Sequence, residues 1–540
     1  MSMFNVAENR RSVGTHRLPF LVLSTAVVTV AAAGGAFAAP VSATPPPPIA
    51  NTQDPSAGAD FVGSPAAARP LPPKPVMRPQ VSGVHGDSGN TKVYDGPAPL
   101  GTDLQVTSMA GTGGPILPFP LPDGRMTAIQ LNASDVSVQA ISAVDPTTMA
   151  VLASWTAPEG QKLNGYMYQR ADGAILATSK QGHVYVLQRT DTAQKTVITL
   201  KRDIDLASMG VLDPSETLHS AAFDADGGIW FVTGAVTGAS AQTATTTTVG
   251  HIDEDGGARV VHLKDQVVEN GFAVKNTTAY IVTGPAGAAD HANAEGHMYA
   301  FGPGGGKSPR ILWQQAYDSG SATKPGGLSR GSGSTPTLLG SQYVAITDNA
   351  DQQSNILVYR QKAARGGGSQ LVCSVPLGAK NVNSSNDNGM IGYVANGVAS
   401  LVAQNTYNQP VIDPSTGING SWNDESVMTG GMQRVDVTPD GRCVTKWNNP
   451  VQMRGVPAMS TSTGLVYGSA VDPKLAAEGT YVWYTEAIDF RTGKTVWKKR
   501  VGAGGTYNDI GMVVGLGKDG TLYSPVLGGV VSVKDGAAKR

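Results

Sequence analysis

Short runs of apolar residues alternate with tight turns along the chain from about residue 120 onward. A turn dipeptide such as Asp-Gly or Asn-Gly, or a pair that replaces it, precedes a strand-like apolar run, as in Asp226-Gly227-Gly-Ile-Trp-Phe-Val. This unit occurs eight times, and its copies begin at Asp123, Asp172, Asp226, Asn276, Gly340, Asn396, Thr463 and Asp519. The 396 residues from the first copy to the last cover seven intervals of about 57 residues, which indicates a supersecondary repeat.

A second turn follows the first within a unit, most clearly in Ala487-Ile-Asp489-Phe-Arg-Thr-Gly493-Lys-Thr-Val-Trp497. Two hairpins per unit give four antiparallel strands, which is the content of one propeller blade. No amphipathic helical period continues for more than about two turns after residue 100. We therefore predict an all-β chain that folds as a single β-propeller of eight four-stranded blades.

The predicted blades cover residues 112–160, 164–208, 217–266, 270–317, 333–378, 388–449, 456–502 and 510–536. The last unit lacks a fourth strand, and residues 104–109 are placed to supply it and close the ring. Seven blades result instead if a weakly marked unit, around Asn276 or Gly340, is an insertion. Two separate β-sandwiches are a further alternative, which the even spacing disfavours.

The first 100 residues differ from the repeats. Arg10, Arg11 and Arg17 precede an uncharged run, residues 18–33, and a small-residue exit near Ala38, so residues 1–38 are predicted to be a signal peptide. An uncleaved membrane anchor is the alternative. Residues 39–100 hold 14 of the 35 prolines, and we expect a disordered Pro/Ala-rich linker there. The propeller domain then covers residues 101–540.

Composition and cysteine content indicate the class of partner and the cellular compartment. With 40 basic and 41 acidic residues the chain has no net field that would recruit nucleic acid. We expect an exported protein, periplasmic, cell-wall associated or secreted, without a stable transmembrane anchor once the signal is cleaved. Cys373 and Cys443 are the only cysteines, and in an oxidising compartment we expect them to form a disulfide if their Cα atoms lie within about 7 Å.

Two stretches resemble known propeller families. The segment from Ala487 to Trp497 resembles the blade signature of pyrroloquinoline-quinone-like propellers, and His219-Ser-Ala-Ala-Phe-Asp-Ala-Asp-Gly-Gly-Ile-Trp-Phe is similar to the inner-strand pattern of gluconolactonase-like propellers. The chain as a whole resembles an exported quinoprotein-like β-propeller. No adjacent cysteine pair and no Cys-x-x-Cys-His are present, so neither pyrroloquinoline quinone nor haem is expected as a cofactor.

The residues that lead into the first strand of each blade should meet at one mouth of the central channel. Among them, Glu269, Asn386, Asn508 and Asp509 are candidate ligands for Ca²⁺, which takes six to eight oxygen ligands. His219 is a candidate base and Arg454 a candidate anion clamp. Candidate ligand-binding residues are Asn164, Ser334, Thr335 and Asn388, and Asn270 and Asp387 lie at equivalent positions. The alternative is that all of these are turn formers and strand caps.

No catalytic motif is present, which favours a non-catalytic function. We expect a module of the cell envelope or exterior that binds a small-molecule or protein ligand at a propeller face. One alternative is a calcium-dependent lactonase- or esterase-like hydrolase at the central channel. Another is a quinone-dependent dehydrogenase of sugars or alcohols.

Overall fold

The computed structural model describes residues 51–74, 80–82, 84–110, 114, 116–134, 137–234, 245–291 and 293–536. The predicted signal peptide, residues 1–38, lies outside these ranges. Among the described residues, no helix is both long enough and apolar enough to cross a membrane.

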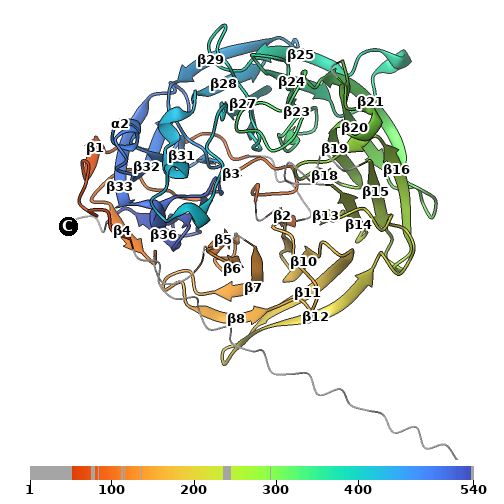
Figure 1. Cartoon of the computed structure of the whole chain (residues 1–540), viewed down its shortest axis with the longest axis horizontal. Coiled ribbons are helices and arrows are strands. Elements are labelled where there is room, and N and C mark those ends of the chain that lie inside the picture. Colours follow the sequence, from red (N-terminus) through yellow and green to blue (C-terminus); the bar gives the residue numbers. More distant parts are fainter. Residues whose placement is uncertain are drawn as a thin grey trace, which may run out of the picture. The chain divides into compact units, whose positions relative to one another are not determined.

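Eight antiparallel sheets make up the fold and lie around a common centre in Figure 1. The strands of blades 1 to 4 are β5 (Ile116–Pro120), β6 (Met126–Leu131), β7 (Val138–Val144), β8 (Val151–Trp155); β9 (Tyr168–Arg170), β10 (Ala174–Thr178), β11 (His183–Asp191), β12 (Thr196–Asp205); β13 (Leu218–Phe223), β14 (Ile229–Thr233), β15 (Thr246–Ile252), β16 (Ala258–Lys264); and β17 (Gln266–Val267), β18 (Ala273–Lys275), β19 (Thr278–Pro285), β20 (Glu295–Gly302), β21 (Arg310–Asp318).

The strands of blades 5 to 8 are β22 (Thr337–Leu339), β23 (Tyr343–Thr347), β24 (Asn355–Arg360), β25 (Leu371–Pro376); β26 (Ile391–Ala395), β27 (Val398–Gln404), β28 (Met432–Val437), β29 (Cys443–Asn449); β30 (Ala458–Ser460), β31 (Leu465–Val471), β32 (Val482–Asp489), β33 (Thr495–Ala503); and β34 (Gly515–Leu516), β35 (Leu522–Val526), β36 (Gly529–Lys534), β4 (Gln105–Ser108). Helical turns are short: η1 (Gly287–Ala289), η2 (Arg365–Gly367), α2 (Pro473–Ala477) and η6 (Gly505–Tyr507), besides three that are described with the site.

Blade 8 is completed from the N-terminal side, as predicted. Strand β4 pairs antiparallel with β36, with Val106 opposite Val533. Asp535, just after β36, accepts hydrogen bonds from the amides of Leu100 (2.7 Å), Gly101 (3.0 Å) and Thr102 (2.9 Å). The ends of the propeller are therefore tied together by a strand pair and by a carboxylate, and the eight-bladed prediction is confirmed.

The predicted turn residues act as expected. Gly173 has a φ of 89°, and a Cβ there would lie 2.6 Å from the Arg189 carbonyl oxygen. A non-glycine residue would be strained by both features. Asp172 accepts a hydrogen bond from the Ala174 amide (3.0 Å), which fixes the reversal between β9 and β10.

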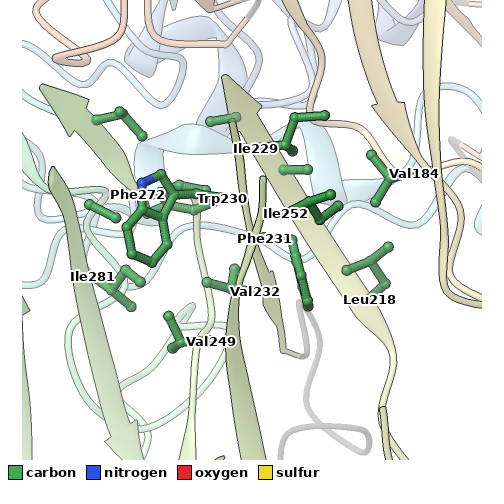
Figure 2. Close-up of a cluster of buried hydrophobic side chains, with 14 of the residues drawn as sticks. Val184, Leu218, Ile229, Trp230, Phe231, Val232, Val249, Ile252, Phe272 and Ile281 are labelled. Carbon is green, nitrogen blue, oxygen red and sulfur yellow. The ribbon is translucent and has the colours of Figure 1, made fainter. Parts of the chain in front are cut away.

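Apolar side chains from neighbouring blades form the core. Figure 2 shows one such cluster, in which Trp230 and Phe231 of blade 3 pack between Val184 of blade 2 and Ile281 of blade 4. Trp230 is fully buried, and its indole N–H donates to the Thr277 carbonyl of blade 4 (3.1 Å). Separate clusters join the other neighbours, including blade 8 to blade 1, so the ring of sheets is closed.

Cys373 on β25 and Cys443 on β29 form a disulfide, as predicted. Their Cα atoms are 6.1 Å apart and their separation in sequence is 70 residues. The bond links the outermost strands of blades 5 and 6. On the chain-entropy account, a loop of this length stabilises the fold by about 4 kcal/mol.

Over its described part, within residues 51–100, the structure differs from the prediction of a disordered linker at residues 39–100, and residues 39–50 of that linker lie outside the described ranges. Within residues 51–100, β1 (Phe61–Gly63) pairs with β33, β2 (Gln80–Ser82) pairs with β9, and β3 (Val93–Tyr94) pairs parallel with β30. Prolines in this segment provide no amide donors, but the backbone carbonyls remain acceptors. Side chains of the blades use them: Tyr393 donates to the Pro72 carbonyl (2.6 Å) and Tyr467 to the Pro99 carbonyl (2.8 Å).

Candidate functional site

A segment of the N-terminal region, residues 84–94, occupies the central channel, and we call it the plug. Four amides, one on the innermost strand of each of blades 4 to 7, donate to four plug carbonyls. The pairs are Val274 to Ser88 (2.8 Å), Leu338 to Gly89 (2.8 Å), Gly392 to Thr91 (2.9 Å) and Met459 to Lys92 (2.9 Å). These amides face the propeller axis and would otherwise need water or a ligand, so the plug replaces that partner.

Polar side chains fix the plug inside the channel. Asn90, at a φ of 57°, donates through Nδ2 to the carbonyls of Phe272 (3.2 Å) and Pro336 (2.9 Å). Lys92 donates to the Val514 carbonyl (2.9 Å), and its burial lowers the pKa of the ammonium group to about 7. His85 Nε2 is 2.9 Å from the Thr335 hydroxyl. Burial, the largest cause, lowers the pKa of His85 to about 3.

A long connection within blade 6, residues 405–431 between β27 and β28, covers the opposite mouth of the channel, and we call it the lid. It contains η3 (Pro414–Thr416), η4 (Ser421–Asn423) and η5 (Glu425–Val427). Trp422 of the lid packs in the same cluster as Leu117 and Leu163, which belong to blade 1 and to the connection into blade 2. The lid therefore extends from blade 6 across the mouth.

The plug enters the channel from the end opposite the lid, and its His85 reaches Thr335, one of the predicted mouth residues. Leu71, which precedes the plug in sequence, contacts the turn between β30 and β31, because its amide donates to the Thr461 carbonyl (2.8 Å). The lid instead contacts residues that precede innermost strands: the Asn408 amide donates to the Pro325 carbonyl (2.8 Å). The predicted mouth residues lie on the lid side.

Glu269 and Asp387 form the first acid pair at this mouth. A Cβ at Gly333 would clash with Asp387 Oδ1 and would lie 2.7 Å from Glu269 Oε1, so the two carboxyls flank this glycine. Ser329 donates to Glu269, and Gln409 of the lid donates to Asp387 Oδ2 (3.1 Å). Burial, together with the neighbouring Asp387, raises the pKa of Glu269 to about 8, and burial raises that of Asp387 to about 7.

Glu425 and Asp509 form the second acid pair, beside Arg454. Glu425 is fully buried in the lid, and neither carboxyl oxygen has a hydrogen-bond partner in the described part of the chain. Burial and the charge of Asp509 raise the pKa of Glu425, and burial raises the pKa of Asp509 to about 6. Arg454 donates through Nη2 to the Pro410 carbonyl of the lid (2.6 Å), and its burial lowers the pKa of the guanidinium group.

Several predicted ligand-binding residues hold the backbone in place. Asn164 donates to the Leu218 carbonyl (2.8 Å), and Asn388 donates to the Arg454 carbonyl (2.7 Å). Ser334 accepts from the Thr347 amide (2.9 Å), while Thr335 donates to Asn270 Oδ1 (2.7 Å). These hydrogen bonds match the alternative that the four residues are turn formers and strand caps. Their role in ligand binding stays a prediction.

The four candidate calcium ligands belong to separate groups of contacts. Glu269 belongs to the first acid pair and Asp509 to the second. Asn508 donates to Asn423 of the lid (2.9 Å), and Asn386 accepts from the Asn388 amide (2.9 Å). No cluster of three or more His, Cys, Asp or Glu side chains suited to a metal ion occurs among the described residues. Calcium binding remains a prediction.

His219, the candidate base, is buried, and its ring lies edge-on to Tyr166 with centroids 5.0 Å apart. Burial lowers the pKa of His219 to about 4, so the imidazole is neutral at physiological pH. A neutral imidazole can accept a proton, but the low pKa makes it a weak base. Its proposed catalytic role stays a prediction.

The plug and Glu425 were not identified as site residues from the sequence. A sequence signal for the lid is the length of blade 6, whose predicted bounds, 388–449, are the widest of the eight. The plug lies in the proline-rich segment, where composition suggested disorder and gave no reason to select His85 or Lys92.

Comparison with known proteins identifies the fold. No protein-family model matches the chain. An uncharacterized protein of Archaeoglobus fulgidus is 24% identical over 245 residues, which is 42% of this chain and 46% of that protein, so the chain spans less than half the length of this relative.

Two solved structures cover most of the chain. The quinohemoprotein alcohol dehydrogenase ADHIIG of Pseudomonas putida HK5 matches 85% of this chain and 80% of its own, at 10% identity and a TM-score of 0.50. The quinohemoprotein alcohol dehydrogenase of Comamonas testosteroni matches 84% and 80%, at 12% identity and a TM-score of 0.50. The chain thus has a quinoprotein-like eight-bladed propeller fold, and the resemblance expected from its sequence is confirmed at the level of fold.

Proposed function

We propose that the protein is an exported β-propeller that binds a ligand or partner of the cell envelope or exterior at the face formed by the lid. The observation that carries this proposal is the double closure of the channel, by the plug from one side and by the lid from the other. The plug takes up channel amides and the lid packs over polar groups that a substrate at the axis would contact, which favours recognition at the surface over catalysis at the axis.

The lid surface offers apolar contact groups. Val411 is 76% exposed and Val427 is 48% exposed, the former being the most exposed large apolar side chain among the described residues. Exposed apolar side chains on an ordered loop are a common basis of recognition. Export is supported by the Cys373–Cys443 disulfide, because such bonds persist in oxidising compartments.

Site-specific photo-crosslinking tests this proposal. A photoreactive amino acid at Val411 should give a discrete crosslinked species when the protein is produced in its own envelope. The same group at Ile311, which is 43% exposed on the outermost strand of blade 4, is the matched control. Equal or absent crosslinking at the two positions would contradict binding at the lid.

A quinone-dependent dehydrogenase is the second candidate, because the two solved structures named above are quinohemoprotein alcohol dehydrogenases. The plug argues against it, since it engages channel amides of four blades where a channel ligand would have to lie. Addition of pyrroloquinoline quinone with Ca²⁺ should therefore leave the melting temperature unchanged. A stabilisation that saturates with quinone, or dye reduction with an alcohol, would favour the dehydrogenase.

The calcium-dependent hydrolase is the third candidate and is supported by the carboxyl groups at the mouth. A titration of chelator-treated protein with Ca²⁺ alone distinguishes the calcium-dependent hydrolase from the binding module and from the dehydrogenase. Stabilisation by Ca²⁺ that is lost in Asp509→Asn would support it, because this residue is a candidate ligand.

A further inference from the structure

A hollow of about 730 Å³ lies at one end of blade 5, between the turn that joins β22 to β23 and the connection from β24 to β25. Three of the residues that line it are cations, Arg360, Lys362 and Arg365, and none of its described lining residues is acidic. We call it the basic hollow. The equivalent turn of blade 7, between β30 and β31, contacts Leu71 at the end where the plug enters, so the basic hollow lies on the face opposite the lid.

The protein does not neutralise the positive charge of the basic hollow. None of Arg360, Lys362 and Arg365 forms an ion pair within 4 Å in the described part of the chain. In the sequence, residues 352–386 include no aspartate or glutamate. Burial, and then the charge of Lys362, lower the pKa of the Lys275 ammonium group, so a fourth cation lies close by. A local positive field therefore faces solvent in a chain whose net charge is −1.

Two buried glutamines fix the backbone that carries these cations. Gln370 donates to the carbonyls of Arg360 (2.8 Å) and Lys362 (2.6 Å). Gln361 donates to the carbonyl of Tyr343 (2.7 Å). The two glutamines are 3% and 6% exposed, respectively. The cations thus stand on an ordered rim, which reduces the entropy lost when a ligand binds.

The size and lining of the basic hollow indicate the class of ligand. Its volume lies within the range of about 300–1,000 Å³ that is typical of ligand pockets. Half-buried Tyr343 lies directly opposite Arg360 on the neighbouring strand, and Ser341 and Ser369 add exposed hydroxyl groups. Hydroxyl groups and a phenol ring beside cations suit a ligand that has both hydroxyl groups and negative charge.

The same lining argues against a membrane surface. Apart from Tyr343, the apolar side chains among its described lining residues are those of two alanines, Ala363 and Ala364. Alanine is too small to insert into a bilayer, and a concave surface does not match a flat one. A soluble anionic ligand therefore fits the basic hollow better than an anionic lipid.

We propose that the basic hollow binds an anionic oligosaccharide, whose carboxylate groups pair with Arg360, Lys362 and Arg365. Phosphate groups are commonly held by backbone amides that converge on one point. The basic hollow instead offers cationic side chains at three positions of the rim, which suits single charges spaced along a sugar chain. This site is separate from the proposed binding at the lid and adds a second recognition surface to the propeller.

Isothermal titration calorimetry of the purified full-length chain with tetragalacturonate, which has one carboxylate per sugar, tests the proposal. We expect saturable binding at low salt that weakens as salt is added, because exposed charges are screened. Maltotetraose, a neutral tetrasaccharide, should not bind. Equal affinity for the two tetrasaccharides would overturn the proposal. Binding of tripolyphosphate or of phosphatidylglycerol vesicles, without binding of tetragalacturonate, would also overturn it.

Variants locate the binding. Lys362→Ala and Arg365→Ala each remove an exposed cation of the rim and should raise the Kd for tetragalacturonate about fivefold, the upper range for one exposed charge pair. Lys195→Ala, which removes an exposed cation from blade 2, is the matched control and should bind as wild type does. Melting temperatures equal to that of wild type establish that the variants are folded. An unchanged Kd in both rim variants, or an equal rise in the control, would overturn the proposal.

Discussion

The carboxyl groups of Glu269 and Asp387, from the connections into blades 4 and 6, lie on either side of Gly333 at the covered mouth of the channel. They are 118 residues apart in sequence. No side chain larger than that of glycine fits between them, since a Cβ at this position would clash with Asp387. The space between the two carboxyls therefore holds no side chain from residue 333, and this position cannot supply a positive charge between them.

This pair makes stability fall as the pH rises. Because the folded-state pKa of Glu269 is about 8, above its ordinary value of 4.5, the folded chain binds more protons than the unfolded chain between these values. The stabilisation is complete below about pH 4.5 and is lost as the pH rises toward 8. Glu269→Gln should weaken the pH dependence of the melting temperature between pH 5 and 8, measured by circular dichroism. A slope equal to that of wild type would show that other groups dominate.

Asp535 should be a strong determinant of ring closure. Its carboxylate accepts the amides of Leu100, Gly101 and Thr102, and Asp535→Ala leaves all three without that acceptor. We expect a loss of about 2 kcal/mol in the free energy of unfolding, measured by urea denaturation. Asp535→Asn keeps one acceptor oxygen and should lose less. Equal stability of Asp535→Ala and wild type would contradict the assigned role.

Substitutions at Asn90 separate two contributions to the stability of the plug, the side-chain hydrogen bonds and the left-handed backbone conformation. Asn90→Gly removes the hydrogen bonds to Phe272 and Pro336 but tolerates the φ of 57°, whereas Asn90→Ala removes the bonds and adds backbone strain. The alanine variant should be less stable than the glycine variant by about 1 kcal/mol. Thermal and urea unfolding of the two variants checks this difference, and the reverse order would refute it.

Reduction of the disulfide should destabilise the pair of blades it links. Cys373→Ser combined with Cys443→Ser should lower the unfolding free energy by about 4 kcal/mol on the chain-entropy account. In reducing agent, the unfolding free energy of wild type should approach that of the double variant. The unfolding free energy of the double variant itself should not change when the agent is added. A response of the double variant would point to an effect of the reagent unrelated to the bond.

The local pattern of the sequence determined the blades. Turn residues such as Asp172 and Gly173 act through their own backbone and hydrogen bonds to near neighbours, so their effect is readable within a few residues. The closing strand at residues 105–108 and the Cys373–Cys443 bond followed from the same repeat, because a ring requires its last blade to be completed and places equivalent strands side by side.

Only the tertiary structure decided the contents of the channel. The plug carbonyls are satisfied by amides of four blades that lie far along the chain, and composition alone could not distinguish this segment from a disordered one. Likewise Glu425 meets Asp509 only because the lid crosses the mouth from blade 6. Burial and the approach of like charges depend on the closed ring of blades, which brings distant residues together, whereas strand and turn preferences depend on each residue and its neighbours.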